Sequence, residues 1–257
     1  MSTEAPREVQ GATFLDLGIA PLTFSEALDE VWRRSDGAHF SFIVTPNVDH
    51  VVRLSREGDD GPLHAAYRTA AIRLCDSRIL ALLARLCGED LPVVAGSDLT
   101  ARLFAETLRP DDRIAVVGGS PALLARLGQQ YPTLDLTHIN APIRLSTDPE
   151  ARRTVVEAVE RARANYVFLA VGAPQSEMIA AEIAGRGIAG GVGLCIGASL
   201  EFVTGLKRRA PVWMQRLKVE WLHRLASEPR RLWRRYLIEG PAIFVIVARW
   251  RLTGRAV

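Results

Sequence analysis

The densest chemistry in this sequence lies in a basic, tryptophan-bearing segment near its carboxyl end. Residues 207–236 contain ten Lys or Arg and two Glu, a net charge of +8, whereas the whole chain carries only +3. The residues before this segment are therefore net acidic. Three of the five Trp also fall within it. Guanidinium and indole groups together suit a phosphate-rich pocket or a lipid headgroup boundary, so this asymmetry predicts an anionic partner.

Three arginines in the basic segment have the spacing of one helical face. Arg224, Arg231 and Arg234 stand at i, i+7 and i+10, so a continuous helix would bring their side chains together. A cluster of guanidinium groups suits bidentate recognition of phosphate oxygens. Pro229 begins a new helical stretch inside this series, and the spacing alone is equally consistent with a solvated basic helix.

Asp76 is the carboxylate that best fits a general base. It falls between two apolar stretches, where an isolated Asp is more often a helix cap. Base function would require an acceptor hydroxyl within hydrogen-bond reach. Thr45 and Asn47 follow the predicted buried strand 39–44 and supply neutral groups that suit a sugar or a diphosphate. No pairing that indicates a triad or a metal site is found for His50, His64, His138 and His223.

Three glycine-containing turns follow predicted strands and lead into helices. Gly118 and Gly119 would present free backbone N–H groups at a helix start, which is a natural phosphate cradle. The turn does not match GxGxxG, and no acidic residue stands at a ribose position, so no nicotinamide cofactor is expected. Gln175 or Glu177 after the second turn, and Glu201 after the third, can face a ligand. For all three turns, a role in packing, in helix capping or at the solvent-exposed surface is as consistent with the sequence as ligand binding.

The elements that must position these groups alternate regularly. Buried strands are predicted at 39–44, 113–117, 134–139, 166–171 and 190–196, with helices between them. Residues 65–74 fit a helix, or a helix followed by a strand. The alternation predicts an α/β fold in which a parallel sheet has helices on both faces. Ligands bind beyond the carboxyl ends of the strands in such sheets.

Composition limits the class of protein further. The chain of 257 residues, 48% apolar, is long enough for one large domain and an appendage. Three cysteines without a CxxC pair indicate a reducing compartment and inert thiols. Neither zinc-site spacing nor a DxD motif is present, so no metal-held nucleotide-sugar diphosphate is indicated. The polar amino terminus is not a signal peptide, and no recognised motif indicates a nucleic-acid partner.

The apolar run 241–248 is the remaining feature of the carboxyl end. It is far shorter than the roughly 20 residues that span a bilayer. Two interpretations are equally favoured: it lies in a membrane interface, or it packs on the body of the protein or on a partner subunit.

Taken together, these motifs resemble a known family, the WecG/TagA/CpsF glycosyltransferases, over about residues 13–254. The most specific part of the resemblance is the RAP…EWL.RL..EP.R pattern of the basic segment. The motifs that carry it are TPN at 45–47, Asp76, LPVVAGSDL at 91–99, GGSP at 118–121, YP at 131–132, VGAPQSE at 171–177, GASLEFVTG at 197–205, RAP at 209–211, EWLHRLASEPRR at 220–231 and RRY at 234–236.

The resemblance implies a metal-independent transferase without a cofactor. Such enzymes move an N-acetylmannosamine-type or related sugar from a UDP donor to a polyprenyl-diphosphate-linked sugar at the inner membrane face. The family's proposed base corresponds to Asp76, and its substrate-contacting Thr and Asn to Thr45 and Asn47. Its appendage arginines, thought to bind the donor diphosphate, correspond to Arg224, Arg231 and Arg234.

Four departures from the family pattern fall at the presumed substrate turns. Ser77 stands where the family usually has Gly after the Asp, and Gln175-Ser176 replaces Lys-Gln. Glu201 replaces Asp, and Lys218-Val219 replaces Gly-Leu. The overall chemistry is expected to be retained with Asp76 and the arginines, while the identities of donor and acceptor are left open.

The sequence therefore predicts an inverting glycosyltransferase of cell-surface polysaccharide synthesis. We expect a disordered segment at 1–12, a Rossmann-like catalytic core at 13–206 and a basic helical appendage at 207–257. The appendage is expected to complete the active site and to hold the enzyme peripherally at the anionic, cytoplasmic face of the cell membrane. The alternative is a non-catalytic protein that binds a nucleotide sugar or a lipid diphosphate. A homo-oligomer is compatible with either.

Overall fold

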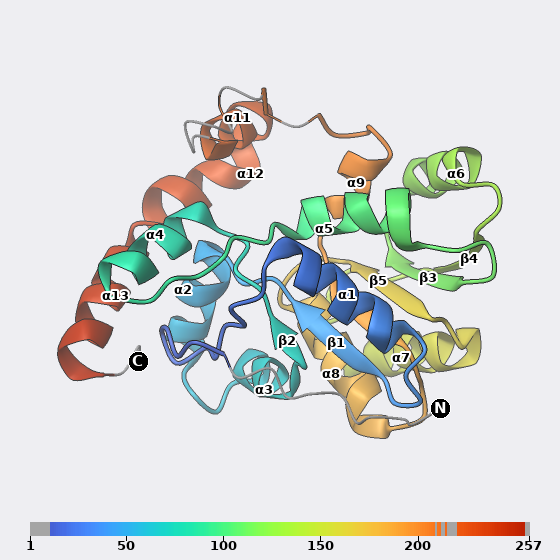
Figure 1. The fold of residues 1–257 in the computed structure, drawn as a ribbon, viewed down its shortest axis with the longest axis horizontal. Coiled ribbons are helices and arrows are strands. Elements are labelled where there is room, and N and C mark those ends of the chain that lie inside the picture. Colours follow the sequence, from blue (N-terminus) through green and yellow to red (C-terminus); the bar gives the residue numbers. More distant parts are fainter. Residues whose placement is uncertain (1–10, 209, 212–213, 215–219, 255–257) are drawn as a thin grey trace.

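The computed structural model describes residues 11–208, 210–211, 214 and 220–254, with the backbone but not the side chain of Arg231. A central sheet carries helices on both sides (Figure 1). The strands are β1 Ser41–Val44, β2 Ile72–Arg73, β3 Arg113–Gly118, β4 Asp135–Ile139, β5 Tyr166–Ala170 and β6 Val192–Cys195. The helices that cover the sheet are α1 Phe24–Ser35, α2 Val48–Glu57, α3 Pro62–Thr69, α4 Arg78–Leu86, α5 Gly96–Arg102, the π-helix η1 Leu103–Thr107, α6 Pro121–Gln130, α7 Pro149–Ala162, α8 Gln175–Arg186 and α9 Ser199–Val203.

All six strands are parallel and lie in the order β2-β1-β6-β5-β3-β4. The predicted α/β fold with a parallel, Rossmann-like sheet is confirmed. The ambiguous stretch 65–74 is a helix followed by a strand, because α3 ends at Thr69 and β2 pairs with β1 at the sheet edge. This two-residue strand brings the chain back to the carboxyl edge of the sheet just before Asp76.

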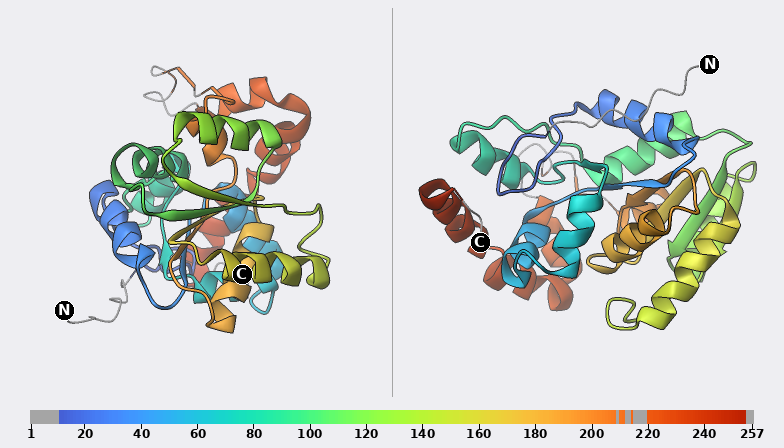
Figure 2. Two further views of the ribbon diagram at one scale, coloured as in Figure 1. Left: turned by 90° about the vertical axis from the view of Figure 1, so that its right-hand side faces the viewer. Right: turned by 90° about the horizontal axis from the view of Figure 1, so that it is seen from below.

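The strands bury both of their faces, as parallel strands between helical layers do. Ala115 and Val117 belong to one apolar cluster, whereas their neighbours Ile114 and Val116 belong to the other. Residues of α2, α3, α4, α7 and α8 complete the first cluster, and residues of α1, α5, α6 and α9 complete the second. Helices are seen above and below the strands in Figure 2.

Four consecutive helices follow near the carboxyl end: α11 Glu220–Ser227, α12 Pro229–Trp233, the π-helix η2 Arg234–Glu239 and α13 Ala242–Thr253. We call them the carboxyl-terminal helices. Both η2 and α13 contact α2. One face of α13 packs on the body of the protein, with Ile243, Ile246 and Val247 buried in the first cluster. Its other face exposes Phe244 and Val245.

The packing of α13 extends to the start of the described chain. The Trp250 ring makes an edge-on contact with Phe14 at 5.4 Å between centroids, and Arg251 donates to the Leu86 carbonyl. Residues 1–10 of the segment expected to be disordered lie outside the described residues. Ala12, within that segment, is ordered, because it forms an antiparallel bridge with Ile19.

Candidate active site

A cleft of about 1130 Å³ lies between the sheet's carboxyl edge and the carboxyl-terminal helices. One wall comes from the residues that follow β1 and β2, together with α4 and the start of α5. The opposite wall comes from α11, η2 and the beginning of α13. Of these, η2 and α13 lie against α2, and α11 lies at the top of the view in Figure 1. The cleft is therefore at the edge where parallel sheets bind their ligands.

Asp76 lines this cleft three residues beyond the end of β2. Its backbone N–H donates to the Pro46 carbonyl at 2.9 Å, which ties the loop to the end of β1. Burial raises the pKa of the Asp76 carboxyl to about 7, although Arg224 and a hydrogen bond from the Gly96 backbone act to lower it. Such a group can accept a proton from an alcohol during a reaction.

Arg224, on α11, lies on the wall opposite Asp76. Its guanidinium carbon is 5.6 Å from the centre of the Phe202 ring. Lys207 anchors this wall, because its ammonium group is 2.7 Å from Glu201 and 3.0 Å from Glu228. The two ion pairs join α9 to the junction of α11 and α12. Arg224 is thereby held where it can neutralise negative charge that develops inside the cleft.

Arg235 also lines the cleft, together with Arg78, Arg85 and Arg208, and sequence reasoning missed it as a site residue. Its Nε lies 3.3 Å from Asp49 Oδ1, and its Nη2 donates to Asn47 Oδ1 at 3.4 Å. It follows Arg224 by eleven residues, close to three helical turns, and this spacing was the available signal. The signal is weak because Pro229 interrupts the helix and η2 has π-helical geometry.

The other two predicted arginines are not placed on the cleft. Arg234 does not line it, and its guanidinium points to Glu239 at 3.3 Å with most of the side chain exposed. The backbone of Arg231 belongs to α12, but its side chain lies outside the described part of the structure. Among the side chains that the structure describes, Arg224 is the member of the predicted face that lines the cleft.

Asn47 and Thr45 occupy different depths at the end of β1. Asn47 lines the cleft and caps α2, with Oδ1 accepting from the Asp49 backbone N–H at 3.0 Å. Thr45 is buried behind the cleft, and its hydroxyl donates to the Cys195 carbonyl at 3.4 Å. The Thr45 side chain also packs against Gly96, where an added Cβ would lie 3.1 Å from the hydroxyl.

The remaining predicted ligand contacts do not line the cleft. Gly118 ends β3 and Gly119 follows it, both with positive φ angles, and an added Cβ at Gly118 would lie 2.6 Å from Val171. Packing alone therefore requires a glycine at that turn. Gln175 accepts a hydrogen bond from the Leu145 backbone at 3.2 Å, and Glu201 forms an ion pair with Lys207.

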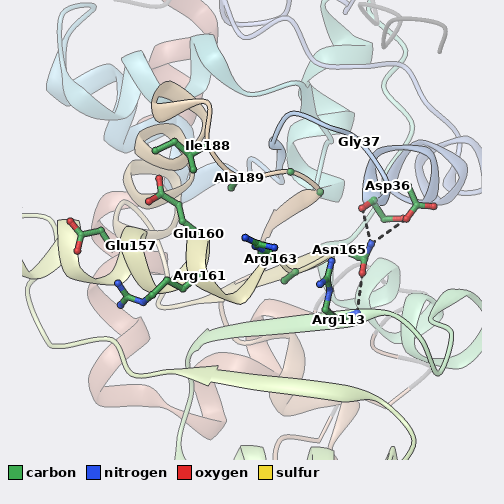
Figure 3. A pocket seen from close by; sticks show the side chains of 14 residues that line it. Asp36, Gly37, Arg113, Glu157, Glu160, Arg161, Arg163, Asn165, Ile188 and Ala189 are labelled. Atoms are coloured by element: carbon green, nitrogen blue, oxygen red, sulfur yellow. Dashed lines mark hydrogen bonds between the residues drawn. The ribbon is translucent and has the colours of Figure 1, made fainter.

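A second cavity, of about 950 Å³, lies at the opposite edge of the sheet (Figure 3). Arg113 begins β3 there, and the Asn165 side chain accepts from its backbone while donating to Asp36 at 3.2 Å. Basic and acidic side chains alternate around this cavity, with Arg161 and Arg163 near Glu157 and Glu160 (Figure 3). It combines opposite charges at the amino ends of the strands, so the cleft at Asp76 is the better candidate.

Other chemistries have little support among the side chains that the structure describes. Within that part of the chain, no group of three or more His, Cys, Asp or Glu is arranged to hold a metal ion. Cys75 and Cys195 are buried and Cys87 is half-buried, and burial raises the pKa of Cys75 to about 11. None of the described helices has the length and apolar character needed to cross a membrane.

The family model described as "Glycosyl transferase WecG/TagA/CpsF family" matches residues 12–257. The match covers both walls of the cleft, and it therefore includes Asp76, Asn47 and the carboxyl-terminal helices.

Proposed function

This chain belongs to the WecG/TagA/CpsF family of glycosyltransferases, and from that premise we propose its substrates and mechanism. The donor is a UDP-sugar of the N-acetylmannosamine type or a related sugar. The acceptor is a sugar linked to polyprenyl diphosphate, and the product serves cell-surface polysaccharide synthesis. Both substrates carry a diphosphate, which fits the arginines and the mixed polar and apolar lining of the cleft.

The observation that carries this proposal is the position of Asp76 opposite Arg224 in one cleft. In the proposed step, the acceptor hydroxyl attacks the anomeric carbon of the donor while its proton passes to Asp76. The bond between that carbon and the UDP oxygen breaks, and UDP leaves with the electron pair. A single displacement of this kind inverts the anomeric configuration. Arg224 and Arg235 stabilise the charge on the departing diphosphate, so the proposed reaction needs no metal ion.

The carboxyl-terminal helices support a location at the membrane surface. Leu237, Ile238, Phe244 and Val245 are all exposed apolar side chains on η2 and α13, and Arg249 on α13 adds an exposed positive charge. Phe244 also lines the cleft. We propose that this surface meets anionic lipid at the inner face of the membrane. The cleft would then open toward the lipid that carries the acceptor.

The alternative function is binding of a nucleotide sugar or a lipid diphosphate without transfer. It is favoured by the first turn of α8, where Ser176 is buried and donates to the Leu169 carbonyl at 3.2 Å. This turn departs from the family pattern and directs the Ser176 hydroxyl into the protein. The Ser176 hydroxyl therefore does not reach a substrate in the cleft.

A transfer assay separates the two functions. The protein is incubated with a panel of UDP-sugars and a short-chain prenyl-diphosphate-linked sugar, and products are separated by chromatography. We expect one donor to be consumed and the new glycosidic bond, examined by NMR, to have the inverted configuration. Calorimetric binding of donors without product across the whole panel would instead support the alternative.

A further inference from the structure

A buried polar cluster lies directly beneath Asn47 and is not used by the reaction described above. It contains His50 from α2, Tyr67 from α3 and Glu177 from α8, and Asp49 and Arg235 border it. Tyr67 Oη and Glu177 Oε2 are two of the five buried side-chain atoms without a hydrogen bond among the described residues. Buried polar atoms that lack partners are uncommon, and their concentration at one place suggests a functional role.

The imidazole of His50 is held in one tautomer. The Asn47 backbone N–H donates to His50 Nδ1 at 3.2 Å, so Nδ1 carries no proton. Burial lowers the pKa of His50 to about 4; Asp49 opposes this effect, and Arg235 and Arg53 add to it. The ring is therefore neutral at pH 7, with its proton on Nε2. Nε2 faces Glu177 Oε1 at 3.6 Å.

Glu177 is a costly residue to bury at this place. It is only 2% exposed, and burial raises its pKa to about 7, although Arg53 acts to lower it. Its neighbours are polar or titratable from three sides: Asp49 and Arg53 on α2, Tyr67 on α3 and Cys195 on β6. An apolar side chain would fill the same space without the cost of removing a carboxyl group from water.

The cluster reaches the cleft through Asn47. Its Oδ1 accepts hydrogen bonds from the Asp49 backbone and from Arg235, which leaves the Nδ2 amide group for a ligand. The backbone of Asn47 is fixed by His50, and its side chain is fixed by Arg235. A shift of the His50 ring would therefore move a residue that lines the cleft.

We propose that Glu177 and His50 are positioning residues for the transfer reaction. Glu177 orients the His50 ring, and His50 holds Asn47 so that its Nδ2 group points at the substrate. This inference rests on the proposed function. It assigns no proton transfer with substrate to either residue, so neither of them is a catalytic residue.

Two substitutions of His50 test the proposal, because each replaces a different ring nitrogen. His50→Asn places an amide oxygen near the position of Nδ1 and keeps the acceptor for Asn47. His50→Gln reaches toward Glu177 but removes that acceptor. Misplacement of a substrate contact by about 1 Å can cost on the order of 100-fold in rate. We expect His50→Gln to lower kcat by at least about tenfold more than His50→Asn, with equal melting temperatures.

Glu177 is tested in the same way. Glu177→Gln retains an acceptor for His50 Nε2, whereas Glu177→Leu has similar size and retains none. We expect kcat for Glu177→Leu to fall below that of Glu177→Gln, with little change in the KM for the donor. His138→Gln, on the exposed edge strand β4, is the control and should behave as the unaltered protein. Equal rates within each pair, or losses that simply follow melting temperature, would overturn the proposal.

A readout without substrate separates this inference from the proposed function. Long-range ¹H–¹⁵N spectra should show His50 with its proton on Nε2 at every pH from about 6 to 8. The ring stays neutral over this range because its pKa is lowered to about 4. The backbone amide signal of Asn47 should move in His50→Gln and stay near its position in His50→Asn. A protein that transfers no sugar but shows these signals would contradict the proposed function alone. An Asn47 signal indifferent to both substitutions would remove the positioning role.

Discussion

Arg235 Nε lies 3.3 Å from Asp49 Oδ1, and this ion pair joins η2 to the first turn of α2. The same guanidinium donates to Asn47, 188 residues earlier in the chain. One side chain thus connects the carboxyl-terminal helices to the edge of the sheet and borders the cleft. Conditions or substitutions that loosen the pair should alter the shape of the candidate active site as well as its charge.

Replacing Asp76 with Asn should abolish most of the transfer activity. The amide has nearly the same shape but cannot accept the proton of the acceptor hydroxyl. Loss of a general base typically costs about 10²–10⁴-fold in rate. The effect is measured as the initial rate with a lipid-linked acceptor. Calorimetric binding of UDP is the control, because it should be unchanged if the site is intact. Turnover at the unaltered rate would exclude Asp76 as the base.

The rate should depend on pH through the ionisation of Asp76. Because the pKa of its carboxyl is raised to about 7, kcat should increase as pH rises toward 7 and level off above it. The raised pKa also means that the folded state favours the protonated form. The contribution of Asp76 to the free energy of unfolding is fully present below the ordinary carboxyl pKa of about 4, and it is lost as the pH rises through about 7.

The same ionisation predicts a difference in thermal stability. Asp76→Asn should melt a few degrees above the unaltered protein at pH 8, and the difference should shrink toward pH 5. Calorimetry across this range measures it. A melting difference that grows as the pH falls would mean that the sign of the pKa shift is wrong.

The arginines should contribute unequally to stabilising the leaving diphosphate. Arg224→Gln and Arg235→Gln remove positive charge from the cleft and should each lower kcat by about 10²–10³-fold. Arg234→Gln is the matched comparison on the same helical segment, and its loss should be smaller because Arg234 points to Glu239. Rate measurements with one donor at saturation decide the order. A larger loss for Arg234 than for Arg235 would support the original sequence-based assignment.

Chelation should leave the transfer rate unchanged if arginines serve in place of a divalent ion. The enzyme is dialysed against EDTA and assayed with and without added Mg²⁺ or Mn²⁺. We expect the three rates to agree within about twofold, a spread of only about 0.4 kcal/mol in activation free energy. Loss of activity on chelation with recovery on adding one of these metals would contradict the proposed mechanism.

Binding to lipid vesicles should depend on the exposed apolar face of α13. Val245→Glu places a negative charge on that face and should reduce sedimentation with vesicles of phosphatidylcholine and phosphatidylglycerol. Ile188→Glu is a matched control, because Ile188 is 67% exposed and Val245 is 69% exposed, and Ile188 lies at the second cavity. Equal binding by both variants would argue against this surface as the membrane contact.

Much of the fold could be predicted because its strands are apolar and regularly separated by helices. Arg113–Gly118 and Tyr166–Ala170 are strands close to their predicted bounds, and each is buried on both faces. The short strand Ile72–Arg73 was ambiguous, since two residues carry almost no periodic signal and follow a helix directly. Its existence depends on pairing with Ile43, a contact that local sequence does not encode.

The candidate site was harder to predict because its residues come from distant elements. Asp76 and Asn47 stand out as polar residues after apolar stretches, and the structure places both on the cleft. Arg235 was missed because the break at Pro229 and the π-helix rotate the side chains away from the expected face. The pairing of His50 with Glu177 joins helices far apart in the chain and left no local pattern.

The burial of α13 has a practical consequence for dissecting this protein. Ile243, Ile246 and Val247 share an apolar cluster with Val51 and Leu80, so the tail is part of the core and not a detachable lid. A protein truncated after residue 240 would lack α13, and the apolar side chains of α2 that α13 covers would be exposed to solvent. If such a truncation lost activity, the loss could come from misfolding or from the missing active-site residues. Single side-chain substitutions separate these two causes.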